Sequence, residues 1–464
     1  MIAPDVLAKA LIEFLPRQRW FAAGETRVGD VAVADLEVLR RDWPALVWVE
    51  ARVGTGAAGG DRYQVLVALR PSGEPAPFLQ GHPDLTLGEL DTDAGPAYGY
   101  DALVDPDLAV ELVHLMAPDE NVTRARLVPG EQSNTSVVID ERLFLKVFRR
   151  LHAGPNPEVE VTRELFERAF LHVVEPVAEW RRGDTDLAVL QGYLGGGVDG
   201  WAMALTSLRD LFAVQETQPI PIISDADPAP EPVDPSAAGG DFSGEAERLG
   251  DMTAELHVTM ADVFGRAAGD AASWADTIDD QLGRAQHRDT QLNDTQLNDI
   301  DRDRLRARID ALRRVDDPGP AIRVHGDYHL AQVMRTDEGW YVLDFEGEPA
   351  RSIEERRRPT SALKDVAGML RSLHYASMVA MFERDEEHTD EAAAWEQRNR
   401  EAFLTGYLPK ARAAGVVPDD ETSTAVVLAA FETEKALYEL GYEQALRPDW
   451  ARIPLAALRR LAVE

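Results

Sequence analysis

The chain has 464 residues, 45% of them hydrophobic, so it is long enough to bury a large core divided among two or three subdomains. Its 82 Asp and Glu residues outnumber its 48 Lys and Arg residues, which gives a formal net charge of −34. A surface of this sign repels nucleic-acid backbones and anionic membranes, which argues against proteins that bind either. The chain has no cysteine, and this excludes disulfides, thiolate zinc sites and cysteine nucleophiles.

The N-terminal segment MIAPDVLAKALIEFLPRQRW has no basic stretch followed by a long apolar run, so it does not predict a secretory leader. No segment approaches the roughly 20 apolar residues that a membrane span needs. We expect a cytoplasmic protein.

The first 95 residues predict a helix followed by an antiparallel sheet. The helical pattern VLAKALIEFL precedes the alternating runs DVAVADLEVLR, ALVWVEARVG and DRYQVLVALR. From about residue 123 to 200 strands dominate again, with one helix from about Glu158 to Ala169. Beyond about residue 241 the pattern is mainly helical, interrupted by a hairpin at 333–345.

Two segments resemble insertions. Residues 217–240 are rich in Pro, Ala and Asp, which is too polar and too broken for a packed element. The pentapeptide DTQLN occurs twice, at 289–293 and 294–298, and two copies are too few for a solenoid. We predict a small duplication in a solvated helix or loop.

The segment HGDYHLAQVMRTDEGWYVLDFE, from His325 to Glu346, carries the strongest functional signal. Asp327 comes two residues after His325, Gln332 lies five residues further on, and the run WYVLDF contains Asp344. VMR and WYVLDF predict two strands and TDEG the turn between them, so a hairpin would bring Asp344 beside Gln332. Kinase-like folds place a catalytic base and two metal ligands in this order.

The segment therefore predicts a small-molecule phosphotransferase. Asp327 would accept the proton of a substrate hydroxyl, and Gln332 and Asp344 would bind Mg²⁺ against the phosphates of a nucleotide. A His-Gly-Asp turn alone is ordinary turn chemistry, but a structural turn does not also require the amide, the hairpin and the second acid. We expect His325 to brace the loop, whereas His329 either contacts the substrate or packs in the core.

A nucleotide site is predicted earlier in the chain. The segment SNTSVVI followed by LFLKVF indicates a polar turn between strands and then a lysine within an apolar run. Backbone N–H groups and hydroxyls of the turn would contact the phosphates. Lys146 would bind the α- and β-phosphates, unless it points outward by simple strand alternation. The polar residues of the turn are Ser133, Asn134, Thr135 and Ser136.

A carboxylate and a hinge would complete this site. The helix that follows offers Glu158, Glu160 and Glu164 as partners for the lysine, of which we choose Glu160. The segment LAVLQGYLGG at 187–196 would form the strand and hinge that meet the adenine, with hinge residues from Gln191 to Leu194.

Taken together, these motifs resemble those of actinobacterial maltokinases. The resemblance rests on EQSNTSVVI, LKVFRR, HGDYHLAQV, LDFEGEPAR, KDVAGMLRS and EKALYELGYE, and it runs from QRWFA at 18–22 to IPLAALRRL at 453–461. It implies an α+β, protein-kinase-like and aminoglycoside-phosphotransferase-like bilobal fold with an N-terminal cap. It also implies phosphorylation of maltose to maltose 1-phosphate for glucan assembly, using ATP and Mg²⁺, and association with trehalose synthase.

The resemblance implies three parts of the chain and a sugar site. The parts are the cap subdomain at 1–95, the nucleotide-binding N-lobe region at 96–200, and the helical C-lobe with the catalytic loop and sugar site at 201–464. In the sugar site, aromatic rings would stack on the sugar and carboxylates would bind its hydroxyls, although Tyr438 and Tyr442 could instead form a packed stripe. The residues assigned to the substrate are His329, Glu346, Arg371, Tyr438, Glu439, Tyr442 and Glu443.

The acceptor stays open because the chain departs from the family at several positions. These are Ala331, Ala362, Leu373 and His374, of which His374 could touch the acceptor. A related actinobacterial group phosphorylates glucosamine, and an aminosugar suits a carboxylate-rich pocket. The alternatives are therefore glucosamine, giving glucosamine 6-phosphate, and an aminoglycoside. A non-catalytic sugar or nucleotide sensor is the remaining alternative, but it would be expected to lack the catalytic residues, which are present.

Overall fold

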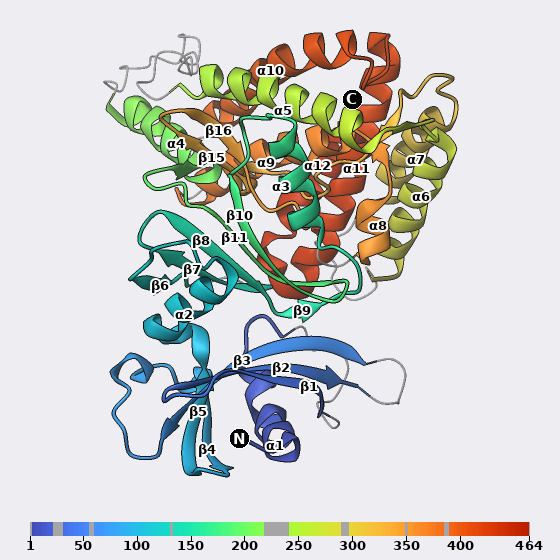
Figure 1. The fold of residues 1–464 in the computed structure, drawn as a ribbon. Helices are drawn as coiled ribbons and strands as arrows, with labels where there is room; N and C mark the ends of the chain where they lie inside the picture. Colours follow the sequence, from blue (N-terminus) through green and yellow to red (C-terminus); the bar gives the residue numbers. More distant parts are fainter. Residues whose placement is uncertain are drawn as a thin grey trace. The chain divides into compact units, whose positions relative to one another are not determined.

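The computed structural model describes residues 2–21, 31–54, 60–129, 133–217, 241–288, 297–348, 351–384 and 389–463. The chain forms two compact units (Figure 1). Unit 1 comprises residues 1–166 and 174–195, and unit 2 comprises residues 167–173 and 196–464.

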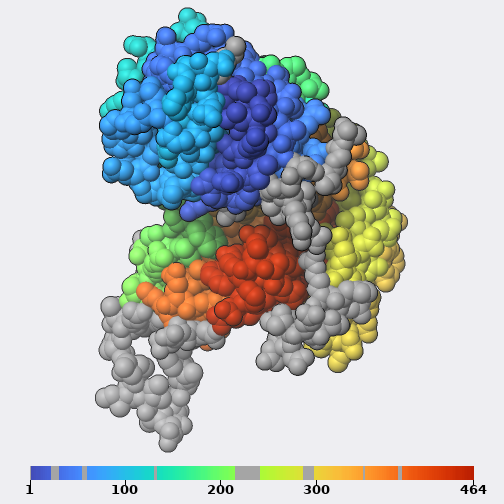
Figure 2. Space-filling view, turned by 90° about the horizontal axis from the view of Figure 1, so that it is seen from below, coloured from blue at the N-terminus to red at the C-terminus, as the bar shows by residue number. Residues whose placement is uncertain are grey.

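Unit 1 begins with an amphipathic helix that covers an antiparallel sheet. Helix α1 (Pro4–Phe14) starts with a proline, whose missing N–H costs no hydrogen bond at this position, and it buries Leu7 and Leu11. Figure 2 shows α1 in dark blue against the lighter blue residues of the sheet. The predicted helix and strands are confirmed. The strands, in the order β1-β2-β3-β5-β4, are β1 (Val31–Arg40), β2 (Ala45–Val53), β3 (Asp61–Pro71), β5 (Gly95–Asp101) and β4 (Thr86–Thr92).

A second antiparallel sheet follows in the same unit. Its strands, in the order β10-β11-β8-β7-β6, are β10 (Pro176–Arg182), β11 (Thr185–Gly192), β8 (Leu143–Phe148), β7 (Asn134–Ile139) and β6 (Ala125–Leu127). The short strand β9 (Arg150–Leu151) continues from β8 and pairs with β3 of the first sheet. Helix α3 (Pro157–Glu167) confirms the helix predicted here.

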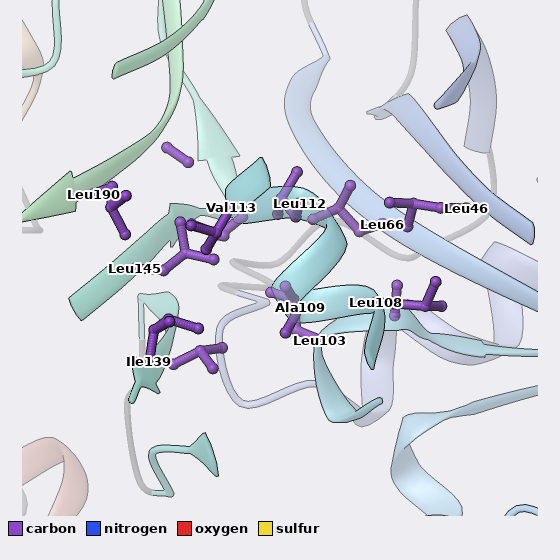
Figure 3. Packing of buried hydrophobic residues seen from close by; sticks show 14 of the residues in the cluster. Leu46, Leu66, Leu103, Leu108, Ala109, Leu112, Val113, Ile139, Leu145 and Leu190 are labelled. Atoms are coloured by element: carbon purple, nitrogen blue, oxygen red, sulfur yellow. The ribbon is translucent and has the colours of Figure 1, made fainter. Parts of the chain in front are cut away.

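Helix α2, which we did not predict from the sequence, joins the two sheets through one core. It spans Pro106–Met116 and is capped by the Asp105 side chain. In Figure 3 its Leu112 lies between Leu66 of β3 and Leu145 of β8, and all three belong to one buried cluster. The first 95 residues and the predicted nucleotide-binding region therefore share a core, and the residues of that core belong to unit 1.

Unit 2 is mainly helical, as predicted. Helices α5 and α10 approach closely because glycines face the partner backbone: a Cβ on Gly250 or Gly406 would lie 2.0 Å from a carbonyl oxygen of the other helix. The helices are α4 (Gly200–Thr217), α5 (Ser243–Phe264), α6 (Ala271–Arg288), α7 (Asp299–Arg313), α8 (Ile353–Arg357), α9 (Leu363–Phe382), α10 (Thr389–Ala413), α11 (Glu421–Leu446) and α12 (Arg452–Val463).

Two small sheets complete unit 2. One consists of β12 (Val198–Asp199), β15 (Val333–Thr336) and β16 (Gly339–Val342), and it confirms the predicted hairpin. The other consists of β13 (Arg266–Ala267), β14 (Ala321–Ile322) and β17 (Thr360–Ser361). Residues 218–240 and 289–296, which hold most of both predicted insertions, lie outside the described residues. In the part of the chain that the structure describes, no helix combines the length and apolar character needed to cross a membrane.

Candidate active site

The loop that carries the candidate base Asp327 (the catalytic loop) follows β14 and is fixed by one buried carboxylate. Asp365, in the first turn of α9, accepts hydrogen bonds from the backbone N–H groups of His325 at 2.7 Å and Gly326 at 2.9 Å. Gly326 has a φ of +86°, a left-handed conformation that glycine adopts without strain. Asp327, the next residue, therefore extends from a backbone held on one side by α9.

Asp365 is itself held by helices α5 and α10. Its Oδ2 lies 3.2 Å from Nε2 of His257, whose Nδ1 is 2.8 Å from the hydroxyl of Tyr407. Burial raises the pKa of the Asp365 carboxyl, but the hydrogen bonds from His257 and from the backbone N–H of Gly326 contribute to lowering it by more, so the pKa lies below its ordinary value. A charged carboxylate with three hydrogen-bond partners anchors the loop.

His325 braces the loop from within, as predicted. The side chain is buried, and its Nε2 lies 2.9 Å from the carbonyl oxygen of Leu343. Its Nδ1 accepts the backbone N–H of Asp327 at 3.3 Å. The ring accepts at Nδ1 and donates from Nε2, and these two hydrogen bonds make His325 a fixed brace for the loop.

The Asp327 carboxylate contacts a lysine that we did not predict from the sequence. Lys435 Nζ of α11 donates to Asp327 Oδ1 at 3.0 Å, and His329 Nε2 lies 3.8 Å from Oδ2. Burial raises the pKa of the Asp327 carboxyl, but Lys435 and His329 lower it far more, to well below its ordinary value. The candidate base is therefore ionised. The sequence signal for Lys435 is its position three and four residues before Tyr438 and Glu439, which puts it on their helix face.

His329 lies beside the candidate base and is 31% exposed at its side chain. Its Nδ1 accepts the backbone N–H of Ala331 at 3.3 Å. The alternative that it packs in the core is therefore wrong, and contact with the substrate stays a prediction.

Gln332 and Asp344 come together because the hairpin of β15 and β16 lies between them. The backbone N–H of Leu343 donates to the Gln332 carbonyl at 2.9 Å, and Gln332 Nε2 donates to Asp344 Oδ2 at 3.4 Å. Asp344 has a φ of +60°, a conformation that costs a non-glycine residue about 1–3 kcal/mol and clusters at functional sites. The predicted proximity of the two residues is confirmed.

The two side chains fit Mg²⁺. An amide oxygen and a carboxylate are ligands that Mg²⁺ accepts, and this ion normally completes its shell with water and substrate phosphates. Among the residues that the structure describes, no group of three or more His, Asp or Glu side chains forms an all-protein metal site. The pair by itself offers two oxygen ligands of the kind that Mg²⁺ accepts.

A cavity lies in front of Asp327 within unit 2, walled by the catalytic loop, α9 and α11. It shares Glu348, Arg351 and Glu434 with an adjoining cleft of about 390 Å³, whose wall includes Trp274. Donors, acceptors and an aromatic ring thus lie together in a space of ligand size.

Of the two predicted sugar-site tyrosines, Tyr438 lines this cavity. Its ring stacks on that of Tyr442, with 6.5 Å between centroids and an interplanar angle of 25°. Tyr442 is 41% exposed. The stacking of the two rings agrees with the alternative that they form a packed stripe. Because Tyr438 lines the cavity, its contact with the substrate stays a prediction.

Three other predicted substrate residues connect helices instead. Arg371, which is 1% exposed, donates to Glu439 from Nε at 3.1 Å and from Nη2 at 2.6 Å. Glu443, which is 2% exposed, accepts from the Tyr375 hydroxyl at 3.0 Å and from Arg447 at 2.7 Å. None of these three predicted residues lines the cavity or the adjoining cleft. In this conformation they stabilise the packing of α9 and α11.

His374 and Glu346, the other two positions considered for the substrate, mainly contact neighbouring protein groups. His374 is buried with its Nδ1 2.8 Å from Glu396, so it does not line the cavity. Glu346 is partly buried just after the hairpin, and its backbone carbonyl accepts from Arg356 at 3.3 Å.

In unit 1, Lys146 lies at the centre of β8, where it pairs with Ser136 of β7 and Val189 of β11. It is 6% exposed, so the alternative that it points outward into solvent is wrong. A lysine this buried remains charged only if anionic or hydrogen-bonding groups surround it. A contact with nucleotide phosphates requires this charged form.

The predicted polar turn beside it is wrong for most of its length, because Asn134–Ile139 form β7 and only Ser133 precedes the strand. Backbone groups of the strand pair with β8, and Ser136 is completely buried. Thr135 accepts a hydrogen bond from Arg149 Nε at 2.8 Å. The β-branched residues that follow extend the strand back into the polar segment.

The structure also shows the burial of the candidate helix carboxylates and the place of the predicted hinge residues. Glu158 is 3% exposed, whereas Glu160 and Glu164 are partly exposed. Gln191 is buried at the end of β11, and Leu194 lies just beyond that strand, next to the end of unit 1 at Gly195. The predicted hinge residues therefore lie at the C-terminal end of unit 1.

Comparison with known proteins now identifies the fold. Residues 14–105 match the maltokinase N-terminal cap domain, and residues 124–348 match the phosphotransferase enzyme family. The second match contains the whole catalytic loop and hairpin. The chain is a phosphotransferase with a maltokinase-type cap. The predicted kinase-like α+β fold is confirmed, and so is an enzyme that transfers phosphate to an alcohol group.

This phosphotransferase is similar to two curated glucosamine kinases. It is 28% identical to that of Mycolicibacterium smegmatis over 355 residues, which cover 73% of this chain and 80% of the relative. It is 26% identical to that of Streptacidiphilus jiangxiensis over 366 residues, which cover 74% of each. A solved glucosamine kinase in complex with glucosamine, ADP and inorganic phosphate shares the fold, with a TM-score of 0.66, 20% identity, and coverage of 99% of this chain and 98% of that one.

Proposed function

We propose that this phosphotransferase moves the γ-phosphoryl group of ATP to a hydroxyl of an aminosugar, with glucosamine as the first candidate. The observation that carries the proposal is the ionised Asp327 carboxylate in a cavity wall, with Gln332 and Asp344 paired across the adjacent hairpin. The two curated relatives, both glucosamine kinases, support the aminosugar.

In the proposed reaction Asp327 accepts the proton of the acceptor hydroxyl as its oxygen attacks the γ-phosphorus. The new O–P bond forms, the bond from the γ-phosphorus to the bridging oxygen breaks, and ADP leaves. The transition state is loose, so orientation matters more than base strength, and a carboxylate with a lowered pKa is sufficient. Lys146 would contact the α- and β-phosphates.

Gln332 and Asp344 would hold Mg²⁺, which when bound supplies positive charge against the phosphate oxygens. The chain contributes the hairpin that keeps the two side chains together and the backbone strain at Asp344.

Maltose is the second candidate acceptor. The cap belongs to the maltokinase type, and a cleft of about 390 Å³ beside the Asp327 cavity offers room for a second sugar ring. Association with trehalose synthase stays a prediction that follows from this alternative, and co-purification of the two proteins would test it.

Release of ADP with ATP and Mg²⁺, measured side by side with glucosamine, maltose and kanamycin, tests the proposal. We expect turnover with glucosamine and loss of turnover with N-acetylglucosamine, a matched control in which the amine is blocked. Turnover with maltose alone would keep the phosphoryl-transfer site and replace the acceptor. Nucleotide binding without turnover of any sugar would contradict the kinase and favour a sensor.

We also propose Glu158, rather than Glu160, as the carboxylate that positions Lys146. Glu158 is the buried carboxylate of α3, and a buried carboxylate needs a cationic or hydrogen-bonding partner. We expect Glu158→Gln to raise the KM for ATP by about 10-fold or more, since a buried charge loses its partner. Glu160→Gln, the same change two residues along the same helix, serves as the control and is expected to stay within about twofold. If Glu160→Gln instead raised the KM for ATP and Glu158→Gln did not, Glu160 would be the carboxylate that positions Lys146.

A further inference from the structure

Lys435, a cation from a distant part of the chain, contacts the catalytic loop. It lies in α11, 108 residues after Asp327, and its Nζ donates to Asp327 Oδ1 at 3.0 Å. Both residues line the same cavity, together with Tyr438, whose ring centroid is 5.3 Å from Nζ. The contact is thus part of the surface that an acceptor would meet.

Most charged groups around this pair have partners of their own, so Lys435 and Asp327 interact mainly with each other. Burial lowers the pKa of Lys435, but Asp327, Glu439 and Glu348 raise it by more, so the ammonium remains charged. Glu439 is already bound by Arg371. The other charged groups of the cavity wall are partnered among themselves or with the loop backbone: Glu348 with Arg351, Glu434 with Lys364 and Arg351, and Asp365 with the N–H groups of the loop.

The two carboxylate oxygens of Asp327 have different neighbours. Oδ1 is bonded to Lys435, whereas Oδ2 lies on the side of His329, 3.8 Å from its Nε2. A carboxylate fixed through one oxygen presents the other in one direction, and a misplacement of about 1 Å can cost about 10²-fold in rate.

We propose that Lys435 is a positioning residue for the phosphoryl transfer, holding Asp327 through Oδ1 so that Oδ2 faces the acceptor hydroxyl. The inference rests on the proposed function, because it takes Asp327 as the base. Lys435 also keeps that carboxylate unprotonated before the acceptor arrives.

Lys435→Met tests the role, since methionine has a similar reach without the charge. We expect kcat at pH 7 to fall about 10- to 100-fold, because the carboxylate loses its fixed orientation, with the KM for ATP unchanged within about twofold. The acid limb of the pH–rate profile is expected to move up by about one unit or more. Without Lys435, burial raises the pKa of the Asp327 carboxyl against less opposition, so the base protonates at a higher pH than in the wild type.

Three comparisons make the result decisive. Lys435→Arg retains the charge and is expected to keep the acid limb of the wild type. Lys435→Gln gives the same test as Lys435→Met if the methionine variant fails to fold, which thermal unfolding would show. Lys410→Met removes a partly exposed lysine of α10 that pairs with Asp251, and it is expected to change neither kcat nor the acid limb.

The inference fails by itself if wild-type enzyme phosphorylates a sugar while folded Lys435→Met or Lys435→Gln keeps the wild-type kcat and acid limb. It also fails if kcat falls but the acid limb stays in place, because that result indicates a packing role only. An inactive wild type would instead overturn the proposed function, and the role of Lys435 in transfer with it.

Discussion

Asp327→Asn is expected to lower turnover by a factor of about 10² or more while nucleotide binding is retained. Asparagine has the shape of aspartate but cannot accept the proton of the acceptor hydroxyl. The nucleotide contacts proposed for Lys146 and for the pair Gln332 and Asp344 do not involve the Asp327 carboxylate. Sugar-dependent ADP release would measure turnover, and calorimetric titration with ADP would measure nucleotide binding.

Asp337→Asn provides the matched control for this prediction. Asp337 is an exposed acid in the turn of the hairpin that joins the two proposed metal ligands, so the same chemical change is made nearby without touching the cavity. We expect turnover close to that of the wild type. Near-normal turnover in Asp327→Asn, or an equal loss in both variants, would remove Asp327 as the base.

Asp365→Ala is expected to lower the free energy of unfolding by about 3 kcal/mol or more and to abolish turnover. The change leaves the backbone N–H groups of His325 and Gly326 and the ring of His257 without their buried acceptor. Each buried polar group that loses its partner costs about 1–3 kcal/mol. The loop that carries Asp327 would lose its fixed position at the same time. Urea denaturation and ADP release measure the two effects.

Asp303→Ala is the control for stability. The Asp303 side chain is 79% exposed in α7 and pairs with Arg306 at 3.5 Å, one turn along the same helix. Such a surface pair contributes little, so we expect a change within about 0.5 kcal/mol. If Asp365→Ala were as stable as Asp303→Ala and remained active, the buried carboxylate would have no anchoring role.

The sequence by itself determined the features that depend on neighbouring residues. Alternation predicted the strands of the first sheet, and the spacing from Asp327 to Gln332 and Asp344 predicted both the hairpin and the proximity of the two metal-ligand candidates. A hairpin closes over a few residues, so its geometry follows from the local pattern. The histidine at 325 was predicted as a brace for the same reason, since its partners are Leu343 and Asp327.

Local patterns failed where packing outweighed local chemistry. The polar residues before Val137 indicated a turn, but strand pairing with β8 extends β7 as far back as Asn134. Helix α2 was missed because its role is to fill the space between two sheets, which no local pattern shows. The choice among Glu158, Glu160 and Glu164 depended on which helix face is buried, and only the packed structure decides that.

Only the tertiary structure decided the electrostatic surroundings of the active site. Lys435 reaches Asp327 across 108 residues of chain, and Asp365 reaches the catalytic loop across 40 and 39. The same packing places Arg371 and Glu443 in buried contacts between helices, although their sequence positions suggested a sugar site. Sequence spacing fixes contacts that lie within a turn or a hairpin. A contact between distant segments depends on how helices α9 and α11 pack, which is a property of the whole core.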